Sequence, residues 1–115
     1  MTRRSARGDV WLVDLGLAAK VRPALVVSIP PTDADRELAT LVPHTTSLRA
    51  SRFEVAVPVR FLKEGAFDVQ SVVTVPTERL LRQLGRLNPA QLAPVEKRLG
   101  FWLGLSTLAE DPSES

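Results

Sequence analysis

An arginine stands where an apolar strand begins, in the segment KVRPALVVS that spans residues 20 to 28. A guanidinium keeps its charge in proteins, and its planar fork meets two oxygens of a phosphate at once. At the mouth of a buried strand, Arg22 would have a rigid base and an apolar wall, where its charge acts more strongly than in water. Spacing alone favours a structural alternative, in which the stem of Arg22 packs over the rim of the core and its head group stays in water.

The segment LVPHTT, residues 41 to 46, supplies further candidates. His44 is the single histidine, and its side chain is the one with an unperturbed pKa near neutrality, so it is a candidate general acid or base. Thr45 and Thr46 can donate hydrogen bonds to a phosphate. Strand alternation places His44 and Thr45 on opposite faces, so both serve one site only if Pro43 introduces a bulge or the strand ends there. A rim histidine and ordinary strand threonines are the alternatives.

Polar and basic residues continue through SLRASR, residues 47 to 52. Ser47, Arg49 and Arg52 suit a phosphate backbone, although a solvated hairpin loop fits the same pattern. Trp11 and Phe53 can stack on bases, but positions in the core are favoured for both. Three acidic residues, Asp9, Asp14 and Glu54, are too scattered along the sequence to predict a carboxylate pair.

Composition restricts the class of protein. The chain has 115 residues, 44% of them hydrophobic and 24% charged, which indicates one globular domain. The sequence has no cysteine and one histidine, which excludes disulfides, thiolate metal sites and a His-rich metal cluster. No apolar run approaches a membrane span, and Asp9 and Asp14 interrupt the segment after the basic start, so no signal peptide is expected. We expect a cytoplasmic protein without a metal or cofactor.

The charge is unevenly distributed. The net charge is +2, and the last seven residues, AEDPSES, carry three acids and no base, so the remainder has a net charge of +5. Twelve of the fifteen basic residues are arginines, which suit phosphate better than lysine does. An anionic partner and ordinary surface charge both account for this pattern.

These residues require a scaffold of short strands. Alternating or continuous apolar patterns predict strands at residues 8–16, 22–29, 38–46, 53–59, 67–75 and 82–87. Residues 30–37 are predicted to form a loop, and residues 77–81 a single helical turn. Short strands with close turns indicate a small barrel.

A helix is predicted to follow the strands. Asn88 as the N-cap, Pro89 at the first position and Gln91 at the third form a capping box. At 100° per residue one stripe is expected to face the sheet, made of Leu92, Val95, Leu99, Trp102 and Leu103. Phe101 and Leu105 are expected to point outward and to form a patch that a homodimer would bury. From the pattern alone, the alternative is that Phe101 folds back over the barrel edge or that the helix ends before Leu105.

Taken together, these segments resemble the MazF/PemK family of toxin endoribonucleases, over Gly8 to about Leu105. The motifs that carry the resemblance are GDVWLVDL, RPALVVS, LVPHTT, FEV, TVPTERLL, LGRL and the closing LGL. The resemblance implies a mainly β, SH3-like (PemK/CcdB-like) barrel of five to seven strands with a C-terminal helix, a homodimer and an acidic antitoxin. The charge pattern and the extent of the resemblance together divide the chain into a basic arm at 1–7, one MazF/PemK-like domain at 8–108 and an acidic tail at 109–115 that we expect to be disordered.

The resemblance also implies metal-independent cleavage of single-stranded RNA, with Arg22 and Thr45 as catalytic residues. Such cleavage needs removal of a proton from the 2′-OH, protonation of the 5′-oxygen and stabilisation of the phosphorane, and gives a 2′,3′-cyclic phosphate and a 5′-OH. Neither Arg22 nor Thr45 is assigned to a proton transfer, and His44 is the candidate general acid or base. The remaining RNA-binding candidates are Lys20, Thr46, Ser47, Arg49, Arg52 and Gln70.

The sequence departs from the family in two places. The first loop, GLAAK at residues 16 to 20, is shorter than usual and has no acid. In a PemK-like branch of the family, an arginine and an aspartate act as acid and base. The matching positions of this sequence hold Asp68 and Gln70, so the same two residue types are not present there. Two rival functions stay open. A CcdB-like gyrase poison would share the fold, and the missing loop acid and Gln70 favour a catalytically inactive module that binds RNA or a protein partner.

Overall fold

The computed structural model describes residues 5–16 and 20–105. Seven strands precede one helix, α1 (Pro89–Leu103). The strands are β1 (Asp9–Asp14), β2 (Val21–Val26), β3 (Leu38–Thr45), β4 (Glu54–Val55), β5 (Ala66–Asp68), β6 (Val73–Pro76) and β7 (Leu80–Arg86). Two 3₁₀ turns, η2 (Val69–Ser71) and η3 (Thr77–Arg79), lie on either side of β6. The predicted mainly β fold with a C-terminal helix is confirmed.

Parts of the predicted segments fall outside the described residues: positions 1–4 of the arm, 17–19 of the first loop and the tail at 109–115. The described end of the arm lies against the body, because Ser5 is buried and Arg7 pairs with Glu96 of α1. Within the described chain, no helix is long and apolar enough to cross a membrane.

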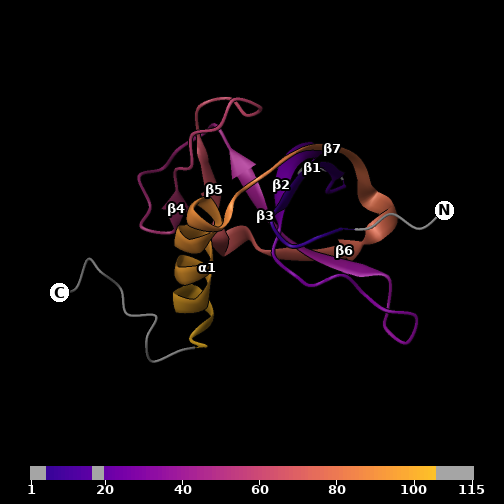
Figure 1. The fold of residues 1–115 in the computed structure, drawn as a ribbon. Coiled ribbons are helices and arrows are strands. Elements are labelled where there is room, and N and C mark those ends of the chain that lie inside the picture. Colours follow the sequence, from indigo (N-terminus) through magenta and orange to yellow (C-terminus); the bar gives the residue numbers. More distant parts are fainter. Residues whose placement is uncertain (1–4, 17–19, 106–115) are drawn as a thin grey trace.

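The strands form one antiparallel sheet in the order β4-β5-β3-β2-β1-β7, with β6 paired to β3 beside this path. Figure 1 shows β4 and β5 beside α1, and β1 and β2 on the other side of the molecule. Among the described residues no ladder joins β4 to β7, so the predicted barrel is an unclosed one.

The prediction of one strand over residues 67–75 is wrong, because η2 divides it into β5 and β6. The carboxylate of Asp68 accepts hydrogen bonds from the amide of Gln70 at 3.1 Å and from the hydroxyl of Ser71 at 2.8 Å. These local bonds compete with a continuous ladder and turn the chain. The two strands therefore pair with different halves of β3, β6 with Leu38–Leu41 and β5 with His44 and Thr45. We call the interval between them the fork.

Two other predicted strands also differ from the structure. The strand expected at 53–59 ends after Val55, and Pro58 has no N–H with which to continue a ladder. The strand at 82–87 begins earlier, at Leu80, directly after the predicted helical turn, which is the 3₁₀ turn η3.

Two apolar cores lie on opposite faces of the central strands. The helix-side core includes Val10, Leu25, Val42, Phe67 and Val95. The core on the other face, which we call the barrel core, includes Trp11, Val13, Ala24, Val26, Ala39, Leu41, Val75 and Leu80. Because successive side chains of a strand point to opposite faces, β1, β2 and β3 each contribute to both cores. Trp11 and Phe53 are buried, as favoured from the sequence.

The predicted capping box is present, since Asn88 and Gln91 exchange side-chain and backbone hydrogen bonds at 2.8 and 2.9 Å. The predicted face of the last turn is wrong. The ring of Phe101 stacks on Phe53 with centroids 5.7 Å apart, and Leu103 is 46% exposed. Trp102 meets Phe53 edge to face at 5.1 Å but stays 41% exposed. Phe101 therefore folds back toward the body, where it contacts the loop that carries Phe53, and the helix ends before Leu105.

Candidate active site

A cleft of about 660 Å³ lies at the fork. It brings together segments that are far apart in the sequence, from the ends of β1 and β3, the start of β2, the loop after β3, and β4, β5, η2 and β6. Five of the predicted site residues line it, namely Arg22, Thr45, Ser47, Arg49 and Gln70. The other lining residues are Leu15, Pro43, Ser51, Glu54, Asp68, Ser71 and Val73.

Strand alternation explains why Arg22 and Thr45 share this cleft. Arg22 lies on the same face of β2 as Ala24 and Val26, and both of these belong to the barrel core. Pro43 and Ala24 are the last partners in the ladder between β2 and β3. Arg22 and Thr45 are each two residues beyond that pair, so antiparallel geometry gives them matching positions on one face. Both side chains therefore lie at the end of the barrel core, beyond its last apolar side chains.

The hydroxyl of Thr45 also shapes the loop that follows it. Its Oγ1 accepts a hydrogen bond from the amide of Ser47 at 3.0 Å. A hydroxyl that accepts one hydrogen bond still has its own proton to donate. The hydroxyl of Thr45 can therefore hold the first turn of the loop and still donate a hydrogen bond to a phosphate oxygen in the cleft.

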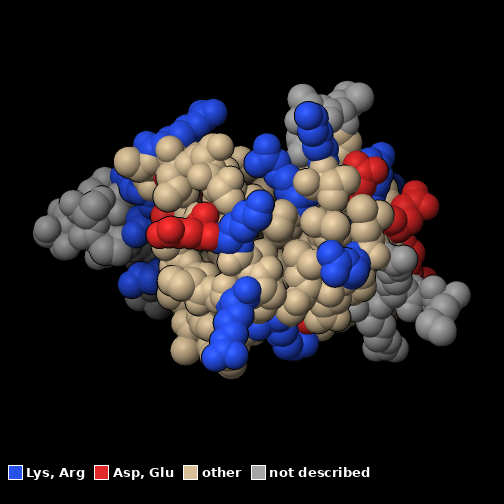
Figure 2. Space-filling model, turned by 90° about the horizontal axis from the view of Figure 1, so that it is seen from above, with Lys and Arg blue, Asp and Glu red and all other residues tan. Residues whose placement is uncertain are grey.

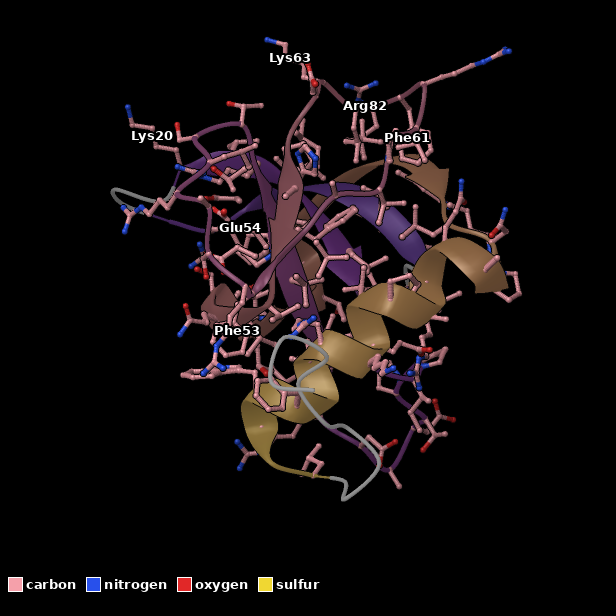
Figure 3. The ribbon with its side chains drawn as sticks, turned by 90° about the vertical axis from the view of Figure 1, so that its left-hand side faces the viewer. Lys20, Phe53, Glu54, Phe61, Lys63 and Arg82 are labelled. Atoms are coloured by element: carbon pink, nitrogen blue, oxygen red, sulfur yellow. The ribbon has the colours of Figure 1, made fainter. Side chains whose placement is uncertain are left out.

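The sequence did not predict that two carboxylates would be paired in the cleft. Glu54 and Asp68 are direct partners in the ladder between β4 and β5, so their side chains are neighbours on one face. They are 14 residues apart in the sequence, and the pairing depends on a register that periodicity does not reveal. Figure 3 shows Phe53 beside α1 and Glu54 toward the side of the molecule where Lys20 lies.

Three predicted RNA-binding residues do not line the cleft. Lys20 and Thr46 are exposed, and they lie next to segments that do line it. Arg52 is on the other side of the loop, with its guanidinium 4.9 Å from the ring of Phe53 and 5.2 Å from that of Phe101. Arg52 therefore covers the aromatic pair at the helix end.

Comparisons with known proteins identify the family of the chain that carries this cleft. The model of the PemK-like, MazF-like toxins of type II toxin–antitoxin systems matches residues 6–103, and that range includes every residue of the cleft. The chain belongs to the PemK-like, MazF-like toxins.

Relatives of this toxin are known by sequence and by structure. The chain is 32% identical over 113 residues to the endoribonuclease MazF9 of Mycobacterium tuberculosis, and the match covers 86% of this chain and 96% of that protein. An endoribonuclease from a mycobacterial species has a similar structure, with a TM-score of 0.75, 25% identity and coverage of 91% and 96% of the two chains. A second, solved in complex with its cognate antitoxin, gives a TM-score of 0.74, 27% identity and coverage of 88% and 96%.

In this toxin, His44 lies on the opposite face of β3 from Thr45, as alternation predicted. It is 5% exposed, and its ring meets that of Phe67 edge to face with centroids 5.0 Å apart. Burial lowers the pKa of His44 below its ordinary value of 6.5, because desolvation disfavours the charged imidazolium. β3 neither bulges nor ends at Pro43, because His44 and Thr45 continue the strand and pair with β5. We therefore assign His44 no part in the cleft.

The lowered pKa of His44 gives a prediction about stability. As the pH falls through about 6.5, the unfolded chain binds a proton before the folded one does, so the free energy of unfolding should decrease. The loss should be complete only below the folded pKa, and it should be absent at pH 8. Urea unfolding at pH 8 and pH 5.5 measures this change. A His44→Gln protein should show a smaller decrease, and an equal decrease in both proteins would contradict the prediction.

Basic side chains outnumber acidic ones on one face of the toxin. Figure 2 shows many Lys and Arg side chains spread over one face of the toxin and fewer acidic ones. In the cleft itself, the two arginines Arg22 and Arg49 are matched in number by two carboxylates. Among the residues that the structure describes, no three His, Cys, Asp or Glu side chains are grouped as a metal site would require.

Proposed function

We propose that this toxin is an endoribonuclease that cleaves single-stranded RNA by attack of a 2′-oxygen on the adjacent phosphate. The observation that carries the proposal is the matching placement of Arg22 and Thr45 at the end of the barrel core. The same cleft holds further side chains that can donate hydrogen bonds to a phosphate. The names of the related proteins support the same activity, since MazF9 and the mycobacterial proteins are endoribonucleases. A single strand is favoured because its bases are free to turn into a cleft.

The proposed reaction forms a bond between the 2′-oxygen and phosphorus and breaks the bond to the 5′-oxygen. The 2′-OH loses one proton, the departing 5′-oxygen gains one, and the products are a 2′,3′-cyclic phosphate and a 5′-OH. Arg22 would neutralise the charge that develops on the phosphorane, and the hydroxyl of Thr45 would donate to a non-bridging oxygen. Asp68 provides a carboxylate in the cleft that is able to accept the proton of the 2′-OH.

The remaining assignments extend this proposal. The related complex with a cognate antitoxin supports an antitoxin as the partner, and we propose that this partner is acidic. The target RNA would place the action of the toxin in the cytoplasm. The homodimer also stays a proposal. The patch expected from Phe101 and Leu105 is replaced by Trp102, Leu103 and Leu105, which are 41%, 46% and 75% exposed. This exposed end of α1 is the surface at which we would look first for contact with a second copy.

An RNA digest tests the proposed function. The purified toxin should cut single-stranded RNA in the presence of EDTA, and the fragments should carry 2′,3′-cyclic phosphate and 5′-OH ends. Cleavage should weaken steeply with salt at low RNA concentration, because contacts between arginine and phosphate release counterions. RNA that stays intact under all conditions would refute the proposal and leave the gyrase poison or the inactive module. Fragments with 5′-phosphate ends would refute the 2′-OH mechanism.

A further inference from the structure

The loop between β3 and β4, residues 46–53, carries three groups into the cleft. These are the side chains of Ser47, Arg49 and Ser51. A loop of this composition would by itself sample many conformations and would lose entropy each time it bound a phosphate. The structure contains a specific set of hydrogen bonds that fixes it, and most of them end on one side chain.

That side chain is the carboxylate of Glu54. The amide of Arg49 donates to both of its oxygens, at 3.1 Å to Oε1 and 3.0 Å to Oε2. The amide of Ser51 donates to Oε1 at 3.0 Å. The backbone of Glu54 closes the same turn, since its own amide donates to the carbonyl of Ser51 at 3.1 Å. A charged acceptor makes such bonds stronger than a neutral one would.

The residue between these two amides has an unusual backbone conformation. Ala50 has a φ of +57°, in the left-handed region that costs a residue with a Cβ about 1–2 kcal/mol. This conformation turns the amides of Arg49 and Ser51 toward the same carboxylate, as in the backbone concavities that bind anions. The bonds to Glu54 offset the cost of holding Ala50 in place.

We propose that Glu54 is a positioning residue, whose carboxylate holds the 46–53 loop so that Ser47, Arg49 and Ser51 face the RNA. This inference rests on the proposed function for its RNA ligand, and it assigns that ligand's backbone to this loop. Glu54 acts through the loop amides. Its negative charge alone would repel RNA, so charge and positioning predict effects of opposite sign when Glu54 is replaced.

A comparison of Glu54→Ala with Glu54→Gln separates the two effects. Both substitutions remove the same charge, but glutamine keeps one oxygen as an acceptor for the amides of Arg49 and Ser51. Binding is measured with single-stranded 2′-O-methyl RNA, which cannot undergo attack by its 2′-oxygens. Glu54→Ala should bind this probe about tenfold more weakly than Glu54→Gln. Its dependence on salt should also fall by about one phosphate contact, a slope change of roughly 0.7. Equal affinities of the two variants, or tighter binding by Glu54→Ala, would overturn the inference.

Hydrogen exchange gives a readout that does not involve RNA. The amides of Arg49 and Ser51 should exchange faster in Glu54→Ala than in Glu54→Gln, while the amides of β1 and β2 should be unaffected. Unchanged protection of the loop in Glu54→Ala would overturn the positioning role even if the wild type cleaves RNA. Fast exchange in Glu54→Ala would support it even if the wild type proved inactive, in which case only the proposed function fails.

A second substitution tests the same loop without altering charge. Ala50→Val places a β-branched side chain in the left-handed region, which such residues essentially avoid. It should weaken binding of the 2′-O-methyl RNA in the same way. The double variant Glu54→Ala/Ala50→Val should lose little more than either single one, because both act through one loop conformation. Losses that simply add would contradict this shared mechanism.

Discussion

Arg22→Ala should reduce RNA cleavage by about a thousandfold while the protein remains folded. Removing one preorganised donor from a site that stabilises developing negative charge costs about 10²–10³ in rate, and Arg22 is the charged group at the end of the barrel core. The side chain is exposed, so its loss should cost little stability. Cleavage of a fixed RNA oligonucleotide under single-turnover conditions measures the effect, and urea unfolding checks the fold.

Two further variants make this test specific. Arg60→Ala removes another exposed arginine that does not line the cleft, so it controls for general charge and should retain most of the activity. Arg22→Lys keeps the charge but loses the planar fork, and it should fall between the wild type and alanine. An Arg22→Ala protein that cleaves at the rate of Arg60→Ala would remove Arg22 from the mechanism.

Gly65→Ala should lower the free energy of unfolding by about 3 kcal/mol, at the upper end of what overpacking usually costs. A Cβ at this position would lie 2.2 Å from the carbonyl oxygen of Thr45 and 2.9 Å from Cε1 of His44. The backbone of β3 cannot rotate away as a side chain can, so β3 and β5 must separate. Cleavage should also fall, because the strand that moves carries Thr45.

A matched control is available at Gly104. Its φ is +66° and no atom lies within 4 Å of a Cβ added there, and asparagine tolerates this conformation. Gly104→Asn should therefore change stability by less than about 1 kcal/mol. Urea unfolding of the two variants makes the comparison. A Gly65→Ala protein as stable as Gly104→Asn would show that β3 and β5 need not approach so closely.

Much of the fold followed from local patterns. The strands around Val10, Leu25 and Val42, the 3₁₀ turn at 77–79 and the capping box at Asn88 are determined by residues close together in the sequence. The fork was not predicted, because the apolar pattern of 67–75 continues through η2. The turn depends on hydrogen bonds from Gln70 and Ser71 to Asp68, and a strand pattern does not reveal them.

The candidate site divides in a similar way. Arg22 and Thr45 were identified because each adjoins an apolar strand and because the segments resemble a known family. Glu54 was dismissed as isolated, since its pairing with Asp68 depends on the register of β4 and β5. His44 was a reasonable candidate by chemistry, and alternation alone was enough to separate it from Thr45. The inward turn of Phe101 depends on contact with Phe53, which lies 48 residues earlier.

The placement of β1 has a consequence for how the protein is made. β1 lies between β2 and β7, and Asp9 pairs with Arg86 near the far end of the domain. Translation delivers the N-terminal strands first, so β1 lacks one neighbour until the segment at 80–86 has left the ribosome. Contacts between such distant residues also form slowly. A growing chain therefore cannot complete the sheet that supports Arg22 until the segment at 80–86 has emerged. For a protein that we propose to cut RNA, the scaffold of the cleft is thus incomplete on any nascent chain that still lacks β7.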